Sequence, residues 1–372
     1  MVWWALVLVG CGAQDPKTSL GEPVENLTEE ISDGDEGAVP EEGGTALGES
    51  PAGTVMFGLA NMPGHGYRGE IIEIDREGNE VWKYTLPESI NPGNIGLQDR
   101  LMDVEPHADG TILFSVNGMG FYRINRAGEL LWHLPDPLAS HDVDLLESGN
   151  ILATHARAAR GQPLVVEYTP DGELVWSWDG TDFFTDPAQV SFQDETGAWA
   201  HVNSVRLQDN GNIRLCVRNF NVILEVDRSG EVVDAVWFDG TGDPRSITVG
   251  PSTGIRGSRP HEPFTRKARS RYVVALRRPA RVIEFDRDKG KIRRVWHAPV
   301  DDPTFAKIRD INLLPGGNWL ITTYDHIIEV NVEHEVVWKY SIDVPDAFAS
   351  YPDLASLHKA SFIDKSGIVY GN

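Results

Sequence analysis

A short phrase that ends on tryptophan returns six times along this chain and constrains its fold more than any other feature. Each copy reads as an apolar strand, a polar turn and a second strand that ends near the indole, as in EIIEIDREGNEVWKY and PLVVEYTPDGELVWSW. Alternating apolar residues on both sides of a polar turn predict a β-hairpin. The six tryptophans are Trp82, Trp132, Trp176, Trp237, Trp296 and Trp338. Intervals of roughly 40–60 residues are typical of β-propeller blades, between which we expect the tryptophans to pack.

A second phrase precedes most of these hairpins and supplies two further strands, so one repeat contains four strands. HDVDLLESGNILATH and IRDINLLPGGNWLITT are examples, each with a polar start, an alternating strand, a turn and a second apolar strand. The C-terminus carries such a copy at 358–371 without a following hairpin, and the hairpin at 70–84 lacks a normal first half. Joining the two ends completes one blade and closes a ring. The sequence therefore predicts an all-β, six-bladed propeller over residues 53–372.

Polar side chains stand where the first strand of several repeats begins. His201 and Asn203 open the strand in AWAHVNSVRL, although buried polar groups cost free energy unless they meet a partner or a ligand. The matching places in other repeats hold His141, His261, Arg309 and His358. The first strand of a propeller blade lines the central channel, so we expect these side chains to converge at one end of it.

Three interpretations of the converging imidazoles stay open. They form a structural belt that binds channel backbone and water, a zinc or copper site, or an anion or catalytic site. No Cys/His spacing motif supports the metal. Arg218 follows the second strand of the repeat that His201 opens, and an antiparallel return would bring it back to the level of His201. A guanidinium among imidazoles suits a tetrahedral oxyanion such as sulfate or phosphate.

Several of these segments resemble the bacterial arylsulfate sulfotransferases that do not depend on PAPS. AWAHVNSV is similar to that family's aromatic-x-His-x-Asn-Ser segment, and CVRNFNVILEVDRSGEVV is similar to the arginine segment and hairpin that follow it. HDVDLLESGNIL and LLPGGNWLITT resemble further strands of the family, so the resemblance extends over the whole predicted propeller. It implies six blades and transfer of a sulfuryl group from a phenolic sulfate to a phenol through a sulfated histidine. Aryl sulfates and phenols are then the expected partners, and we expect no cofactor and no bound metal.

The resemblance also implies a role for each matching residue. His261, in SRPHEPF, matches the nucleophilic histidine of the family. His141, His201 and Arg218 match the residues that hold the sulfate oxygens, and Thr322 or Thr323 matches a threonine near the sulfate. Asn203 is assigned to substrate binding with them. A neutral imidazole is a competent nucleophile near neutral pH, and fixed donors would stabilise the charge that develops during transfer.

Two other functions are weighed against this one. The first is a propeller of the same ancestry without catalysis, which binds a ligand or a protein at the channel mouth. The second is a quinone-dependent dehydrogenase, which we disfavour because such propellers usually have eight blades.

The N-terminus resembles the lipobox of bacterial lipoproteins. MVWWALVLVGCGAQ is a short apolar run with small residues before Cys11. We therefore expect residues 1–11 to be a lipoprotein-type signal segment and the Cys11 thiol to carry lipid. Residues 12–52 are rich in Glu, Asp, Gly and Pro and contain no aromatic residue, which predicts a disordered acidic tether. These features predict a bacterial domain that is lipid-anchored in the periplasm or at the outer membrane.

The charge of the chain restricts its partners. The formal net charge is −23 and the pI about 4.8, which disfavours nucleic acid and anionic membrane surfaces as direct partners. We expect membrane association only through the lipid anchor. The second of the two cysteines, Cys216, lies in the apolar strand IRLCV and is expected to be a buried free thiol.

Overall fold

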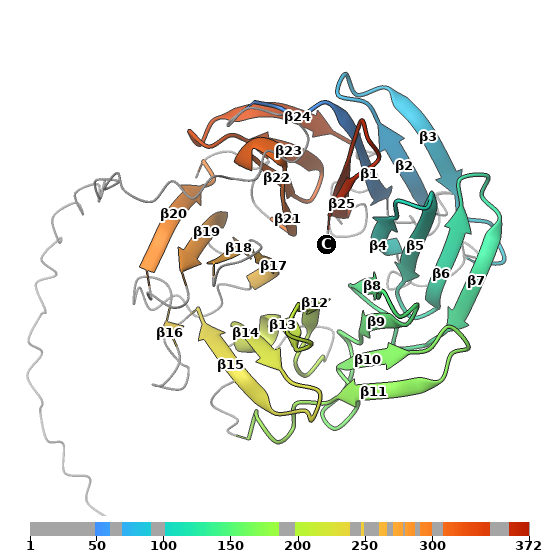
Figure 1. Cartoon of the computed structure of the whole chain (residues 1–372), viewed down its shortest axis with the longest axis vertical. Coiled ribbons are helices and arrows are strands. Elements are labelled where there is room, and N and C mark those ends of the chain that lie inside the picture. The colour runs from blue at the N-terminus through green and yellow to red at the C-terminus, as the bar shows by residue number, and fades with distance from the viewer. Residues whose placement is uncertain are drawn as a thin grey trace, which may run out of the picture. The chain divides into compact units, whose positions relative to one another are not determined.

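The strand–turn–strand phrases of the sequence form six antiparallel sheets that stand around a central channel (Figure 1). This computed structural model confirms the predicted six-bladed propeller. The structure describes residues 49–59, 69–90, 101–185, 198–238, 247–248, 260–265, 271–277, 280–286, 291–299, 308–342 and 357–371. Cys11, the predicted signal segment and residues 12–48 of the predicted tether lie outside these residues. Across the described ranges, no helix is long and apolar enough to cross a membrane.

The two ends of the propeller sequence build one blade together. From the channel outward, blade 1 consists of β25 (Leu357–Asp364), β1 (Gly53–Leu59), β2 (Glu70–Ile74) and β3 (Glu80–Thr85). This arrangement is the predicted ring closure. One detail differs from the four-strand repeat: β1 takes the second place, and β26 (Val369–Tyr370) pairs with the other edge of β25. The N-terminal strand can fill that place because it runs antiparallel to both β25 and β2.

The other five blades follow in chain order. Blade 2 contains β4 (Leu101–Pro106), β5 (Thr111–Val116), β6 (Gly120–Asn125) and β7 (Leu130–Pro135). Blade 3 contains β8 (Val143–Leu145), β9 (Ile151–Thr154), β10 (Val165–Tyr168) and β11 (Leu174–Trp178). Blade 4 contains β12 (Val202–Leu207), β13 (Ile213–Val217), β14 (Val222–Val226), β15 (Val232–Trp237) and the short parallel strand β16 (Ile247–Thr248). Blade 5 contains β17 (Pro260–Thr265), β18 (Arg271–Arg277), β19 (Ala280–Asp286) and β20 (Lys291–His297). Blade 6 contains β21 (Asp310–Leu313), β22 (Trp319–Thr322), β23 (His326–Val330) and β24 (Val336–Ser341).

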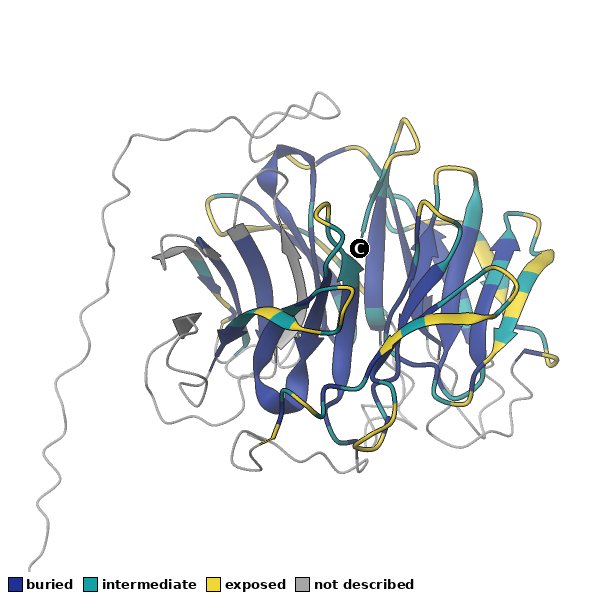
Figure 2. Cartoon of the chain, turned by 60° about the horizontal axis from the view of Figure 1, so that its bottom comes forward, coloured by how far each residue is buried: buried dark blue, intermediate teal, exposed yellow. Residues whose placement is uncertain are grey.

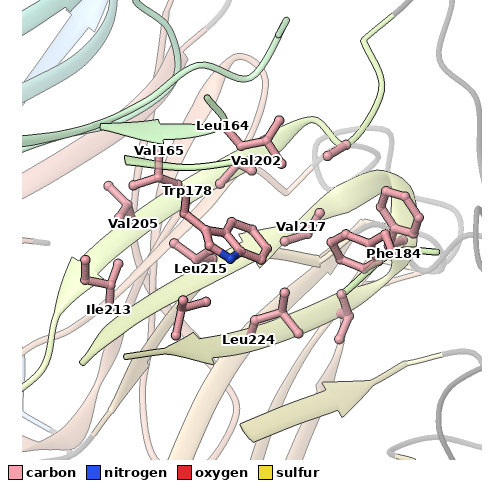
Figure 3. Close-up of a cluster of buried hydrophobic side chains, with 14 of the residues drawn as sticks. Leu164, Val165, Trp178, Phe184, Val202, Val205, Ile213, Leu215, Val217 and Leu224 are labelled. Carbon is pink, nitrogen blue, oxygen red and sulfur yellow. The ribbon is translucent and has the colours of Figure 1, made fainter. Parts of the chain in front are cut away.

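The hydrophobic core lies between neighbouring blades. Figure 3 shows the layer in which Leu164, Val165 and Trp178 of blade 3 pack against side chains of β12, β13 and β14 in blade 4. The inner strands are almost wholly buried, whereas the outermost strands of several blades alternate between exposed and half-buried positions (Figure 2). A blade thus buries its two faces only against its neighbours, so the ring has to be complete to be stable. Cys216 is a buried free cysteine, as predicted.

In the described part of the chain, four of the six repeated tryptophans also donate a hydrogen bond to a turn of the next blade. In the contact between blades 6 and 1, Trp338 Nε1 donates a hydrogen bond of 2.7 Å to the carbonyl of Arg76, which lies in the turn between β2 and β3. The Arg76 guanidinium covers the Trp338 ring at 4.3 Å and pairs with Glu329 on β23. We call this unit of tryptophan, arginine and glutamate a clasp. The other two described clasps are Trp82 with Arg126 and Glu73, and Trp176 with Arg228 and Glu167. The predicted packing of tryptophans between blades is therefore correct.

The contact between blades 2 and 3 lacks both charged partners of the clasp. Trp132 still donates to a turn carbonyl of the next blade, but the turn residue is Pro170, and the glutamate position of blade 2 holds Arg123. Arg123 pairs instead with Asp109 inside its own blade. A buried carboxylate without a cationic partner would be costly, which explains why the two members of the pair are missing together.

Candidate functional site

Several of the predicted site residues stand where the innermost strands begin. These strands are β25, β4, β8, β12, β17 and β21, which lie nearest the ring axis (Figure 1). His141 lies two residues before β8, His201 directly before β12, and Arg309 directly before β21. His358 is the second residue of β25. The repeat therefore brings polar side chains from four blades to one end of the channel.

Three imidazoles meet at this end. His201 Nε2 lies 3.1 Å from His141 Nε2, and the two rings are nearly perpendicular with centroids 4.7 Å apart. The His358 ring centroid lies 5.9 Å from that of His141. Ser140 Oγ contacts His141 Nδ1 at 2.6 Å. A direct contact between two Nε2 atoms requires one nitrogen to donate and the other to accept, so at least one ring of this pair is neutral.

Arginine side chains surround the imidazoles. Arg309 Nη1 lies 2.6 Å from His358 Nε2, and its guanidinium lies 5.1 Å from the centre of the Tyr324 ring. Arg218 is only 8% exposed and is close enough to His141 to repel a proton on it. We call His141, His201, His358, Arg218 and Arg309 the cationic cup. It is a local concentration of positive and protonatable groups in a chain of net charge −23.

The cup lowers the pKa of one of its own members. The pKa of His141 lies well below its ordinary value, first because the ring has lost its hydration and then because charged neighbours repel a proton on it. These neighbours are His201, His358, Arg218 and Arg157. His141 is therefore neutral near pH 7. An anion at this point would offset the repulsion, because charge-assisted hydrogen bonds form with every member of the cup.

The depressed pKa of His141 predicts a pH dependence of stability. As pH falls through about 6.5, His141 takes up a proton in the unfolded chain but not in the folded one, so the unfolded state binds more protons and stability is lost. We expect His141→Gln to reduce the loss of unfolding free energy between pH 7.5 and 5.5, by at most about tenfold in the unfolding equilibrium constant per pH unit. Urea titrations of both proteins at each pH measure the difference. Parallel curves for the two proteins would contradict the prediction.

The backbone at His201 is held in an unusual conformation. Its φ is +55°, a left-handed value that L-residues rarely adopt. The short 3-10 turn η2 (Arg218–Phe220) fixes this segment, because the Arg218 N–H donates to the carbonyl of His201 at 3.0 Å and the Asn219 N–H donates to Ala200 at 3.0 Å. Arg218 therefore holds His201 through its backbone while its guanidinium joins the same cup. Arg218 lies beside His201, as predicted, because β13 runs antiparallel to β12 and ends next to the residue that precedes β12.

The left-handed backbone at His201 predicts that glycine is a more stable replacement than alanine there, the reverse of the usual order. Alanine and glycine both remove the His201 imidazole, but only glycine adopts a positive φ without strain. We expect His201→Gly to be more stable than His201→Ala by roughly 1 kcal/mol in urea unfolding. His141, whose φ is not positive, provides the matched control, and there alanine is expected to be the more stable replacement. The same order at both positions would show that the strain at His201 has no energetic weight.

The other predicted residues fall at different distances from the cup. Thr322 is fully buried at the end of β22, and its carbonyl accepts the Arg309 N–H at 2.8 Å. Its hydroxyl has no hydrogen-bond partner among the described residues, whereas the Thr323 hydroxyl contacts the backbone of His326. Asn203 is buried at a register shift in β12. His261 lies on the innermost strand β17 at a similar shift, and its side chain lies outside the described residues.

A layer of carboxyl groups and one lysine lies directly beneath the cup. Asp142 Oδ2 accepts the N–H of Val205 at 2.5 Å, and Asp310 Oδ2 accepts the N–H of Ala360 at 3.2 Å. Each of these carboxylates thus ties its innermost strand to that of the next blade. The Lys359 ammonium pairs with Asp142. The polar residues at the strand starts therefore form a structural layer in addition to the cup. A structural belt was one of the three interpretations of these residues that the sequence left open.

Burial gives this layer unusual acidities. Desolvation raises the pKa of Asp310 to about 6 and that of the nearby Asp144 to about 7. Sequence reasoning missed this inter-strand role of the carboxylates, although an acidic residue directly after the polar start of a repeat is a readable signal. It also missed Arg157, which reaches the cup from the loop after β9 and belongs to no repeated position.

Comparison with known proteins gives one family. Residues 58–237 match the family described as Arylsulfotransferase (ASST). This range contains His141, His201, Asn203 and Arg218, and it ends before His261. No curated protein gave a significant match.

Two solved structures align with this chain at low sequence identity. A protein of unknown function from Bacteroides caccae aligns with a TM-score of 0.55 and 17% identity, over 84% of this chain and 98% of that one. Virginiamycin B lyase from Staphylococcus aureus aligns with a TM-score of 0.47 and 15% identity, over 88% of this chain and 96% of that one. Likenesses of this kind concern the fold alone. The match over residues 58–237, within a six-bladed propeller, supports the arylsulfotransferase family for this chain.

Proposed function

We propose that this protein transfers a sulfuryl group from an aryl sulfate to a phenol and that the cationic cup holds the sulfuryl oxygens. One observation carries the proposal. Burial lowers the pKa of His141, and the imidazoles of His201 and His358 and the guanidinium of Arg218, brought together from other blades, lower it further by repelling a proton on it. Such an arrangement is stabilised when an anion of the size of a sulfate occupies it. The match of residues 58–237 to the arylsulfotransferase family supports the same substrate class.

Transfer in two steps fits the residues at this end of the channel. In the first step a neutral imidazole, assigned to His261, attacks sulfur; an N–S bond forms, the S–O bond breaks, and the phenolate leaves with the electron pair. In the second step the oxygen of the acceptor phenol attacks sulfur and the N–S bond breaks. The electron pair of the broken bond returns to the His261 imidazole, and a neutral ring of the His141–His201 pair accepts the phenol proton. Arg218 and Arg309 stabilise the charge on the sulfuryl oxygens in both steps.

The test is release of p-nitrophenol from p-nitrophenyl sulfate by the purified chain, followed in the absence and presence of phenol. We expect phenol to accelerate the release and His261→Ala to abolish it. His133→Ala, on the outer strand β7 and stacked on Tyr122 away from the channel, is the matched control and should retain activity. A parent protein without turnover would refute the enzymatic proposal. Saturable sulfate binding without turnover would assign the cup to a non-catalytic binding protein instead.

A further inference from the structure

Beneath the cationic cup, two innermost strands direct four carboxyl groups into the channel. Asp103 and Glu105 lie on β4; Asp142 directly precedes β8, and Asp144 is the second residue of β8. Residues two apart on a strand share a face, so each strand contributes a pair. One oxygen atom each of Asp103, Glu105 and Asp142 lies within 4.8 Å of the other two. These three side chains form what we call the carboxylate triplet.

The triplet is fixed in place, and the oxygen atoms left for coordination belong to Asp103 and Glu105, because Asp142 Oδ1 already pairs with Lys359. Asp103 Oδ2 accepts the N–H of Val143 at 3.0 Å, and Asp142 Oδ2 accepts the N–H of Val205 at 2.5 Å. In the described part of the chain, Asp103 Oδ1 and Glu105 Oε1 have no hydrogen-bond partner. Asp103 is 1% exposed and Glu105 is 6% exposed. Buried carboxylate oxygens without a partner are costly, so such atoms point to a missing ligand.

Two cations lie near these carboxyl groups in the described part of the chain. Lys359 pairs with Asp142 and lies 3.5 Å from Asp103, and Arg206 is the cation near Asp144. Burial and the neighbouring carboxylates raise the pKa of Asp103 and that of Glu105 well above their ordinary values. A divalent cation on the triplet would offset this cost of ionisation.

A route from solvent leads to the triplet. Glu105 lines a pocket of about 410 Å³ together with Pro106, His107, Ser361 and the 366–371 segment. Pro106 and His107 stand at the end of β4, so this pocket opens at the end of the channel opposite the cup. An ion can therefore reach Glu105 without passing the proposed sulfuryl site.

We propose that Asp103, Glu105 and Asp142 bind a divalent cation, calcium, in the channel beneath the cationic cup. An all-oxygen set of carboxylates selects hard cations, and two Ca–O distances of about 2.4 Å span the separation within the triplet. The ion would join β4 of blade 2 to Asp142 of blade 3. The sequence predicted no metal, because the ligands come from two repeats and follow no motif spacing. This site is independent of the proposed transfer of sulfuryl groups.

The experiment uses the full chain after treatment with EDTA and removal of the chelator. Calcium chloride is titrated in by calorimetry, and the melting temperature is followed at each concentration. We expect a saturable site with a stoichiometry near one, and a melting temperature that rises with calcium. Asp103→Asn and Glu105→Gln should each weaken the affinity at least about tenfold, because each removes a charged ligand. Without calcium, Glu105→Gln should melt no lower than the parent, since it removes a carboxyl group whose ionisation is disfavoured by burial.

Asp310→Asn is the matched control. Asp310 is fully buried in the same channel and also accepts a backbone N–H from the next blade, but it is not part of the triplet. It should retain the calcium affinity of the parent. Calcium uptake that is unchanged in both Asp103→Asn and Glu105→Gln would place the ion elsewhere, for example on the acidic residues of 12–48, and would overturn the proposal. Absence of saturable binding in the parent would overturn it too.

Discussion

Arg218→Ala is expected to lower kcat/KM for aryl sulfates by about 10²–10³-fold, the usual effect of removing one fixed donor from a site of developing negative charge. The guanidinium of Arg218 is 8% exposed and acts on His141 at the centre of the cationic cup. A planar guanidinium donates two parallel hydrogen bonds to a sulfuryl group, which the ammonium of lysine cannot do. Arg218→Lys should therefore recover only part of the activity. Initial rates with p-nitrophenyl sulfate and phenol measure both variants.

A second readout separates this role from a structural one. Arg218 lowers the pKa of His141, so its removal should raise that pKa, which an NMR titration of the imidazole detects. Arg214→Ala is the matched control. Arg214 is equally buried on β13, but it pairs with Glu225 and covers Tyr272, away from the cup. Its removal should lower the melting temperature and leave kcat/KM nearly unchanged. An Arg218→Ala enzyme within threefold of the parent would exclude a direct role for the guanidinium.

Arg76→Ala is expected to destabilise the propeller by roughly 3 kcal/mol, because it leaves the buried carboxylate of Glu329 without its cation. Glu329 is fully buried, and Asn318 Nδ2 and Ser50 Oγ also donate to it. The variant further loses the guanidinium that covers Trp338. The clasp joins blade 6 to blade 1, the blade built from both ends of the propeller. A decrease in melting temperature of roughly 5 °C follows for a domain of this size.

Arg126→Ala tests whether burial decides the size of this effect. Arg126 forms the same clasp between blades 1 and 2, but its side chain is 37% exposed where that of Arg76 is 14% exposed. Water can solvate the partner left behind, so the expected loss is about 1 kcal/mol or less. Chemical denaturation of the two variants provides the comparison. Equal losses would mean that the clasp owes its stability to the tryptophan contact and not to the ion pair.

Much of the ring was predictable from the sequence, because the signals for its hairpins lie between residues that are close together in the chain. The hairpins ending on Trp82 or Trp338 carry their turn chemistry and their apolar alternation within about 15 residues. Counting them predicts the number of blades, and the half-repeats at the two ends predict the closure. The position of β1 was harder to predict from the sequence. Either β1 or β26 could be the second strand of blade 1, and the outcome depends on which of them pairs with the outward edge of β25.

The candidate site was predictable only in part. The repeat placed His141, His201 and His358 at equivalent positions, and the structure brings their rings together. Arg157 could not be found in this way, because the loop after β9 repeats nothing. The left-handed backbone of His201 was equally hidden, since it depends on hydrogen bonds from Arg218 and Asn219. The role of His261 stays a prediction.

By itself, the sequence determined the period, the number of blades and the end of the channel at which the polar residues collect. These properties follow from alternation and turn chemistry, which act between residues that are near one another in the chain. Only the tertiary structure decided which charges meet: Arg76 with Glu329, Lys359 with Asp142, and one imidazole with another. Such pairs join strands from different blades, and electrostatic interactions depend on distance and burial, which the fold alone sets.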